Sequence, residues 1–130
     1  MTIYEAEMQC VSGSLMGLTF SRRYNDDSAS QIVVWLDPDG DALKAAVFGG
    51  ASYLNDALTM ATSTWYKLRL VLVGSAVDVY CDTGSGLEYR ASVFVQEESG
   101  IAYRFGLATW GNSAKFRNIK AWNANLSLPA

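Results

Sequence analysis

The stretch that decides the fold reads Trp65-Tyr66-Lys67-Leu68-Arg69-Leu70-Val71-Leu72-Val73, then a Gly74-Ser75 turn, then Ala76-Val77-Asp78-Val79-Tyr80-Cys81-Asp82. Apolar side chains recur with a period of two in this stretch, which is typical of half-buried β-strands. Glycine and serine favour turn geometry, so the two segments are predicted to form an antiparallel hairpin. Gly84 and Gly86 are predicted to end the second strand.

Short alternating segments separated by turn residues continue along the whole chain. We expect about ten strands, and no segment has a convincing helical period. The predicted strands span residues 3–12, 15–23, 30–37, 42–48, 52–58, 64–73, 76–82, 87–96, 102–111 and 114–123. Strands at spacings of about 8–12 residues favour a two-sheet sandwich or a barrel. Gly17 and Gly106 lie inside strands, where a bulge or the close approach of a ligand or another backbone is the usual reason.

The alternation also assigns two faces to each strand. The residues predicted to face the core are Leu18, Phe20, Ile32, Val34, Leu36, Tyr66, Leu68, Leu70, Leu72, Phe105 and Leu107. Trp35 and Trp110 fall on the opposite alternation, as do Lys67 and Arg69. Both indoles are therefore predicted to face away from the core.

Composition limits the classes of function. The chain has 130 residues, of which 50% are hydrophobic and 18% charged, as expected for one packed domain. The net charge is −3 and the ten basic residues are scattered along the sequence, so nucleic acid is not an expected partner. No apolar run approaches the roughly 20 residues of a membrane span. The chain has no histidine, which excludes Ser-His-Asp and Cys-His catalysis.

Several segments, taken in order, resemble one superfamily. They are Tyr4-Glu5-Ala6-Glu7-Met8, Gly17-Leu18-Thr19-Phe20, Gln31-Ile32-Val33-Val34-Trp35-Leu36-Asp37 with its Asp-Gly hairpin, Trp65-Tyr66-Lys67-Leu68-Arg69-Leu70, Val77-Asp78-Val79-Tyr80-Cys81-Asp82, Gly106-Leu107 and Phe116-Arg117-Asn118-Ile119. The chain resembles the concanavalin A-like lectin and glucanase superfamily, in its laminin G-like and carbohydrate-binding-module branch.

This resemblance covers residues 3–122 and implies an all-β jelly-roll sandwich of two curved antiparallel sheets. It also implies glycan binding on the concave sheet or its loop rim, with calcium at the rim in some members. The resemblance assigns Trp65 and Trp122 to positions that pack structurally. We expect a single domain at residues 1–123, with residues 124–130 as a C-terminal tail or linker.

Glu5 and Glu7 are the candidate catalytic acids. Strand alternation puts them on one face, about 7 Å apart, whereas retaining glycosidases need carboxyls about 5–5.5 Å apart and inverting ones about 6.5–9.5 Å. Glucanases of the superfamily carry three such acids on a central strand with aromatic walls, and this pair lies on a strand expected to be peripheral. We therefore expect two solvated carboxylates on an outer face and no catalytic residue.

Cysteine and acidic residues give little support for a metal or a cofactor. Cys10 and Cys81 share the alternation of the buried residues, which predicts two buried free thiols, unless the strand ends meet and form a disulfide. Without histidines or paired cysteines, a transition-metal site is not expected. The segment Asp37-Pro38-Asp39-Gly40-Asp41 lacks the EF-hand spacing and is interpreted as a type I hairpin turn. A rim calcium shared with Asn25, Asp26 and Asp27 is the alternative.

Aromatic residues are the best indication of binding, because they bury a large flat area at low entropic cost, and arginine adds forked hydrogen bonds. The predicted ligand-binding residues are Trp35, Trp110, Arg23, Tyr24, Asp37, Tyr103, Arg104 and Asn112. The predicted function is a non-catalytic, lectin-like carbohydrate-binding domain that recognises a glycan, favoured at an extracellular, cell-surface or virion-surface location. It would be a module of a larger protein or a homo-oligomer.

Two alternatives stay open. The first is a structural or adhesive assembly domain, in which an apolar patch around Trp35, Val33 and Phe48 would form a subunit interface. The second, less favoured, is a minimal glycoside hydrolase.

Overall fold

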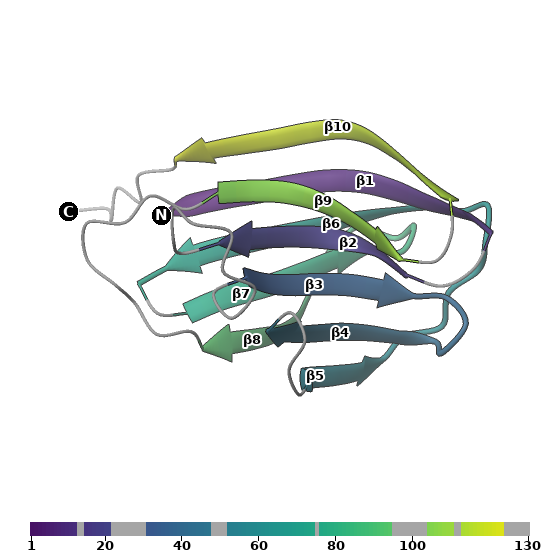
Figure 1. The fold of residues 1–130 in the computed structure, drawn as a ribbon, viewed down its shortest axis with the longest axis horizontal. Coiled ribbons are helices and arrows are strands. Elements are labelled where there is room, and N and C mark those ends of the chain that lie inside the picture. The colour runs from purple at the N-terminus through teal and green to yellow at the C-terminus, as the bar shows by residue number, and fades with distance from the viewer. Residues whose placement is uncertain are drawn as a thin grey trace.

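The computed structural model describes residues 1–12, 15–21, 31–47, 52–74, 76–94, 104–110 and 113–123. They form the strands β1 (Thr2–Ser12), β2 (Leu15–Ser21), β3 (Gln31–Asp37), β4 (Ala42–Val47), β5 (Ser52–Ala57), β6 (Trp65–Val73), β7 (Ala76–Asp82), β8 (Leu87–Phe94), β9 (Arg104–Trp110) and β10 (Ser113–Asn123), shown in Figure 1. Each predicted strand is present, with bounds that differ by two residues or fewer. None of the described segments forms a helix that could span a membrane.

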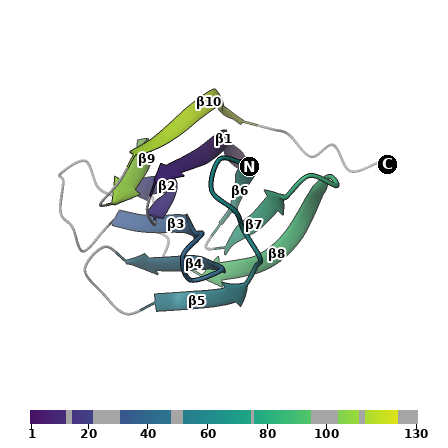
Figure 2. The same cartoon turned by 90° about the vertical axis from the view of Figure 1, so that its right-hand side faces the viewer.

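The strands form two five-stranded antiparallel sheets packed face to face. Sheet A has the order β10-β1-β6-β7-β8 and sheet B the order β5-β4-β3-β2-β9. Figure 2 shows the two layers from one end. This confirms the predicted all-β jelly-roll sandwich. The prediction that the first strand is peripheral was wrong, because β1 pairs with β10 on one side and with β6 on the other.

The core lies between the sheets and follows the predicted alternation. Along β6 and β7, every second residue is buried, including Leu68, Leu70 and Val79. Sheet B contributes Leu18, Phe20, Ile32, Val34, Leu36 and Leu43. Leu107 differs from the prediction: it pairs with the buried Leu18 but is 39% exposed, because β9 is an edge strand.

The two cysteines confirm the thiol prediction. Cys10 and Cys81 are both buried and both free. Burial raises the pKa of both thiols, and for Cys81 the pKa reaches about 12. Neither thiol is therefore ionised at neutral pH.

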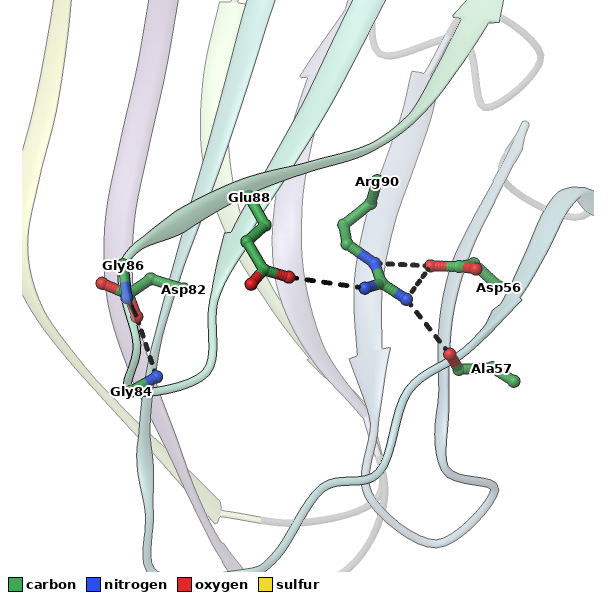
Figure 3. Close-up of polar contacts among 7 residues, drawn as sticks. All are labelled: Asp56, Ala57, Asp82, Gly84, Gly86, Glu88 and Arg90. Carbon is green, nitrogen blue, oxygen red and sulfur yellow. Dashed lines mark hydrogen bonds and ion pairs between the residues drawn. The ribbon is translucent and has the colours of Figure 1, made fainter.

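An ion pair joins the two sheets along the side formed by β8 and β5. The register between β7 and β8 shifts at Tyr80, where Tyr80 pairs with Tyr89 and Val79 with Ala91, so Arg90 is the extra residue of a bulge. Arg90 donates to Asp56 Oδ2 from both Nε and Nη2 at 2.7 Å, and from Nη2 to the carbonyl oxygen of Ala57 at 3.2 Å (Figure 3). The bulge thus turns a basic side chain toward the opposite sheet.

The neighbouring β7–β8 turn is held by its own carboxylate. Asp82 Oδ1 accepts hydrogen bonds from the backbone N–H groups of Gly84 and Gly86, at 2.8 and 3.1 Å (Figure 3). Both glycines have positive φ, at 125° and 110°, which explains why glycine is needed there.

Candidate functional site

The outer face of sheet B carries the predicted tryptophan. Trp35 on β3 lies between Gly17 of β2 and Lys44 of β4, and its side chain is half-buried on the face that points away from the core. A Cβ at Gly17 would lie 2.1 Å from the carbonyl oxygen of Val34 and 2.6 Å from the Cα of Trp35. Only glycine fits at this position, so the backbone itself forms the floor beside the indole.

Small residues continue this floor across neighbouring strands. Gly106 and Ala108 on β9 pair with Thr19 and Gly17 of β2. Val33, two residues before Trp35 on β3, is only 1% exposed although its position in the alternation puts it on the outer face. Val33 therefore offers no exposed apolar surface. The prediction that Val33 belongs to an exposed patch for subunit assembly was wrong. Phe48, also assigned to that patch, lies outside the described residues.

Trp110 shares the alternation of Gly106 and Ala108. It pairs with Leu15, which puts its backbone two residues along β9 from Ala108. Arg104 begins the same strand and pairs with Ser21. The side chains of Trp110 and Arg104 lie outside the described part, as do Arg23, Tyr24, Tyr103 and Asn112 altogether. That these six side chains bind the ligand stays a prediction.

The register divides the predicted binding residues between two ends of sheet B. Ser21, Gln31 and Arg104 are register neighbours at one end, where segments 22–30 and 95–103 join the strands. Trp35 lies four residues along β3 from Gln31, about 13 Å at the strand rise. The backbone positions of Trp35 and Arg104 therefore lie toward different ends of the same sheet.

Asp37 has a structural role. Its Oδ1 accepts the Gly40 N–H at 3.0 Å, and its Oδ2 accepts from Lys44 Nζ at 3.0 Å. These bonds close the β3–β4 hairpin, and the adjacent ammonium disfavours a cation at the carboxylate. Within the described residues no group of three or more Asp, Glu, Cys or His side chains could hold a metal. The residues 25–27 of the calcium alternative lie outside that part.

The outer face of sheet A holds the two acids of β1 in ion pairs. Arg69 donates from Nε to Glu5 Oε1 at 2.6 Å, and the Glu5 side chain is only 4% exposed. Arg117 Nε donates to Glu7 Oε2 at 2.9 Å, and the Asn118 amide donates to the same oxygen. The expectation of two solvated carboxylates was wrong for Glu5, because β1 is an interior strand flanked by cations.

Asn118 reaches Glu7 through a bulge in β10. Glu5 pairs with Lys120 and Glu7 with Arg117, so Ala6 faces both Asn118 and its neighbour. Asn118 has φ 53°, a left-handed conformation that asparagine tolerates better than most residues. Its hydrogen bond is the largest cause of a lowered pKa at Glu7, with the Arg117 charge adding to it.

Two tryptophans on this face contact arginines. The Arg117 guanidinium lies over the Trp65 ring at 3.9 Å from its centroid, and that of Arg69 lies 5.7 Å from the Trp122 centroid. Trp122 is exposed. Both indoles were expected to pack structurally, and this expectation does not hold for the exposed Trp122. Alternation placed Arg69 outward, but no sequence signal linked it to β10.

A polar and aromatic group occupies β7 and β8 of the same face. Tyr80 and Tyr89 make an edge contact at 5.6 Å, and Tyr89 is exposed. The Tyr89 hydroxyl lies 2.6 Å from Ser92 Oγ, which in turn donates to Asp78 Oδ1 at 2.5 Å. Sequence reasoning did not identify this group, because it depends on the bulge at Arg90.

Comparisons with known proteins show the fold. No protein-family model matches the chain, and no curated protein matches its sequence. Among solved structures, the carbohydrate-binding module CBM66 from Bacillus subtilis superposes with a TM-score of 0.73 at 17% identity, covering 94% of this chain and 74% of that one. A functionally unknown protein from Saccharomyces cerevisiae superposes with a TM-score of 0.69 at 11% identity, covering 95% and 70%. At these identities the likeness establishes the β-sandwich only.

Proposed function

We propose that this chain is a non-catalytic carbohydrate-binding domain of the concanavalin A-like, lectin-like kind. The observation that carries the proposal is the fold likeness to a carbohydrate-binding module over 94% of the chain. The half-buried Trp35 beside a glycine and alanine floor on the outer face of sheet B adds local support. A flat indole next to low side chains suits the apolar face of a sugar ring.

The rim at the Arg104 end would supply polar contacts to the same glycan. Arg23, Tyr24, Tyr103 and Arg104 are the residues proposed there, and Trp110 and Asn112 extend the Trp35 end. Asp37 would act by holding the β3–β4 hairpin rather than by touching the ligand. We place such a domain outside the cell or on a cell or virion surface, as a module of a larger protein or a homo-oligomer.

The acids of β1 do not match the requirements of hydrolysis. A general acid needs a raised pKa, which burial or a nearby like charge provides. Glu7 has a lowered pKa instead, and Glu5 is held by Arg69 at 2.6 Å. These contacts support a binding role over a minimal glycoside hydrolase.

A glycan-array screen of the domain tests the proposal, followed by calorimetry of each hit. Trp35→Ala should weaken binding by about 1–3 kcal/mol, or about 5- to 150-fold, as for other stacked rings. Tyr89→Ala is the matched control, since it removes an exposed aromatic from the other sheet. An array without any bound glycan, or an equal loss in both variants, would reject glycan recognition on sheet B.

One observation favours assembly as a second function. Phe94 is 73% exposed and pairs with Ala76, which pairs in turn with the exposed Val73, so three apolar residues form a row at one end of sheet A. Such a row could bury itself against another chain. Sedimentation analysis of the wild type and Phe94→Ser would decide, because assembly through this row predicts an oligomer that the variant loses.

A further inference from the structure

We propose that the outward side chains of β10, β1 and β6 form a second binding surface, for an acidic polysaccharide. This surface, called the basic face below, carries five of the ten basic residues of the chain, listed as Lys67, Arg69, Lys115, Arg117 and Lys120. It carries two acids, Glu5 and Glu7. The basic residues that look scattered in the sequence are thus gathered by strand register.

Three cross-strand rows build the basic face. Lys115 pairs with Gln9, and Gln9 pairs with Trp65. The next row joins Arg117, Glu7 and Lys67, and the third joins Lys120, Glu5 and Arg69. Rows lie about 7 Å apart along the strands, and the outer columns are about 10 Å apart. The face therefore has the extent of a few sugar residues rather than of a single ion.

The arginines in these rows form ion pairs with carboxylates, whereas the lysines form none with the described residues. Arg69 and Arg117 are each bonded to a β1 carboxylate, so their charges are largely neutralised. Within the described part of the chain, Lys67, Lys115 and Lys120 form no ion pair, and Lys115 and Lys120 are exposed. The net charge of +3 on the face therefore resides on the three lysines. Lys115 and Lys120 are exposed, whereas Lys67 is half-buried and pairs in register with Asp82 of β7.

The tryptophans add flat surface at the two ends of the same face. Trp65 stands in the first row under the Arg117 guanidinium, and Trp122 pairs with Ile3 one row beyond Arg69. Each carboxylate fixes an arginine that in turn lies beside an indole. Indoles, amides and separated cations together suit a polymer that has hydroxyls and apolar ring faces with charges on only some units.

The charge distribution favours such a polymer over nucleic acid. The whole chain carries −3, so the remainder of the molecule carries −6 outside the basic face. A nucleic acid has a charge on every phosphate and gains affinity by neutralising many of them, which this divided surface does not offer. A uronate-bearing or sulfated glycan would meet the exposed Lys115 and Lys120 on the edge strand β10, on the side of the face away from Asp82 of β7.

The test measures affinity of the whole domain for polygalacturonate and dextran sulfate, with neutral dextran and duplex DNA as comparisons. Lys115→Gln/Lys120→Gln removes two exposed charges from the basic face. Thr83→Glu/Ser85→Glu changes net charge equally in the exposed β7–β8 turn and serves as the matched control. We expect the lysine variant to bind either acidic polymer about fivefold or more weakly, the control to bind like the wild type, and binding to weaken as salt rises.

Equal losses in the two variants would overturn the proposal, since net charge alone would then explain binding. Failure of the wild type to bind either acidic polymer, or tighter binding of DNA than of both, would overturn it as well. The neutral glycan site on sheet B is tested separately by Trp35→Ala, which should leave affinity for the acidic polymers unchanged. Loss of that affinity in Trp35→Ala would show that there is no second site.

Discussion

Replacing Arg69 by methionine should destabilise the fold more than any other single loss of charge on sheet A. Among the described residues, only Arg69 forms an ion pair with Glu5, whose side chain is 4% exposed. Removing one partner of a buried pair typically costs about 3–5 kcal/mol, because the remaining charge is left unsolvated. Since the Arg69 side chain is itself 32% exposed, water can enter the vacated space, and we expect about 3 kcal/mol.

Urea unfolding followed by circular dichroism gives the measurement. With a slope of about 2 kcal/mol per molar urea, the midpoint of Arg69→Met should fall by about 1.5 M. The Glu5→Leu/Arg69→Met double variant should recover part of this loss, because apolar groups then replace both charges. Arg117→Met is the control: its partner Glu7 is 20% exposed and Arg117 is 49% exposed, so a loss below about 1 kcal/mol is expected.

The reasoning depends on burial, not on the count of ion pairs. If Arg69→Met and Arg117→Met lost the same stability within about 0.5 kcal/mol, burial of Glu5 would not control its energetics. A double variant that is less stable than Arg69→Met would also refute the account.

Three further predictions concern the core, the floor of sheet B and the titration of Glu7. Leu70→Ala should cost about 2–5 kcal/mol, because this side chain is fully buried, and an unchanged urea midpoint would mean that the strand faces are reversed. Gly17→Ala should destabilise the fold by at least about 1 kcal/mol, because the new Cβ would clash with backbone atoms. Gly106→Ala should cost less, because among the described residues its Cβ would meet only one methyl group, at 3.1 Å. Equal urea midpoints for the two variants would contradict this prediction. Because the pKa of Glu7 is lowered in the folded state, its contribution to stability is complete above the ordinary value of 4.5 and is lost as pH falls through the lowered pKa. Asn118→Gly keeps the backbone conformation but removes the hydrogen bond, so NMR titration should show the Glu7 pKa rising, and an unchanged value would refute that cause.

The strands could be predicted because their signal is local. Alternation along β6 and β7 assigns Leu68, Leu70 and Val79 to the core without knowledge of any other strand. Glycine turns then fix where each strand ends. What alternation lacks is the identity of the neighbouring strand, which is why β1 was expected at the periphery and lies in the interior.

The site depends on register and was therefore harder to predict. Trp35 was correctly assigned to an outer face, but its separation from the Arg104 rim follows only from the pairing of β2 with β3 and β9. The pairing of Glu5 with Arg69 spans 64 residues, and bulges at Arg90 and Asn118 redirect side chains by one position. No local pattern encodes such contacts.

The interior position of β1 has a consequence for how the chain folds. β1 is synthesised before both of its partners, β6 and β10, and the contact between Glu7 and Arg117 spans 110 residues. Folding that depends on such distant pairings is slow, on the order of milliseconds to seconds, because large loops must close before the contacts form. During synthesis β1 leaves the ribosome with one edge unpaired until β10 emerges, so this edge is where misassembly between nascent chains would begin.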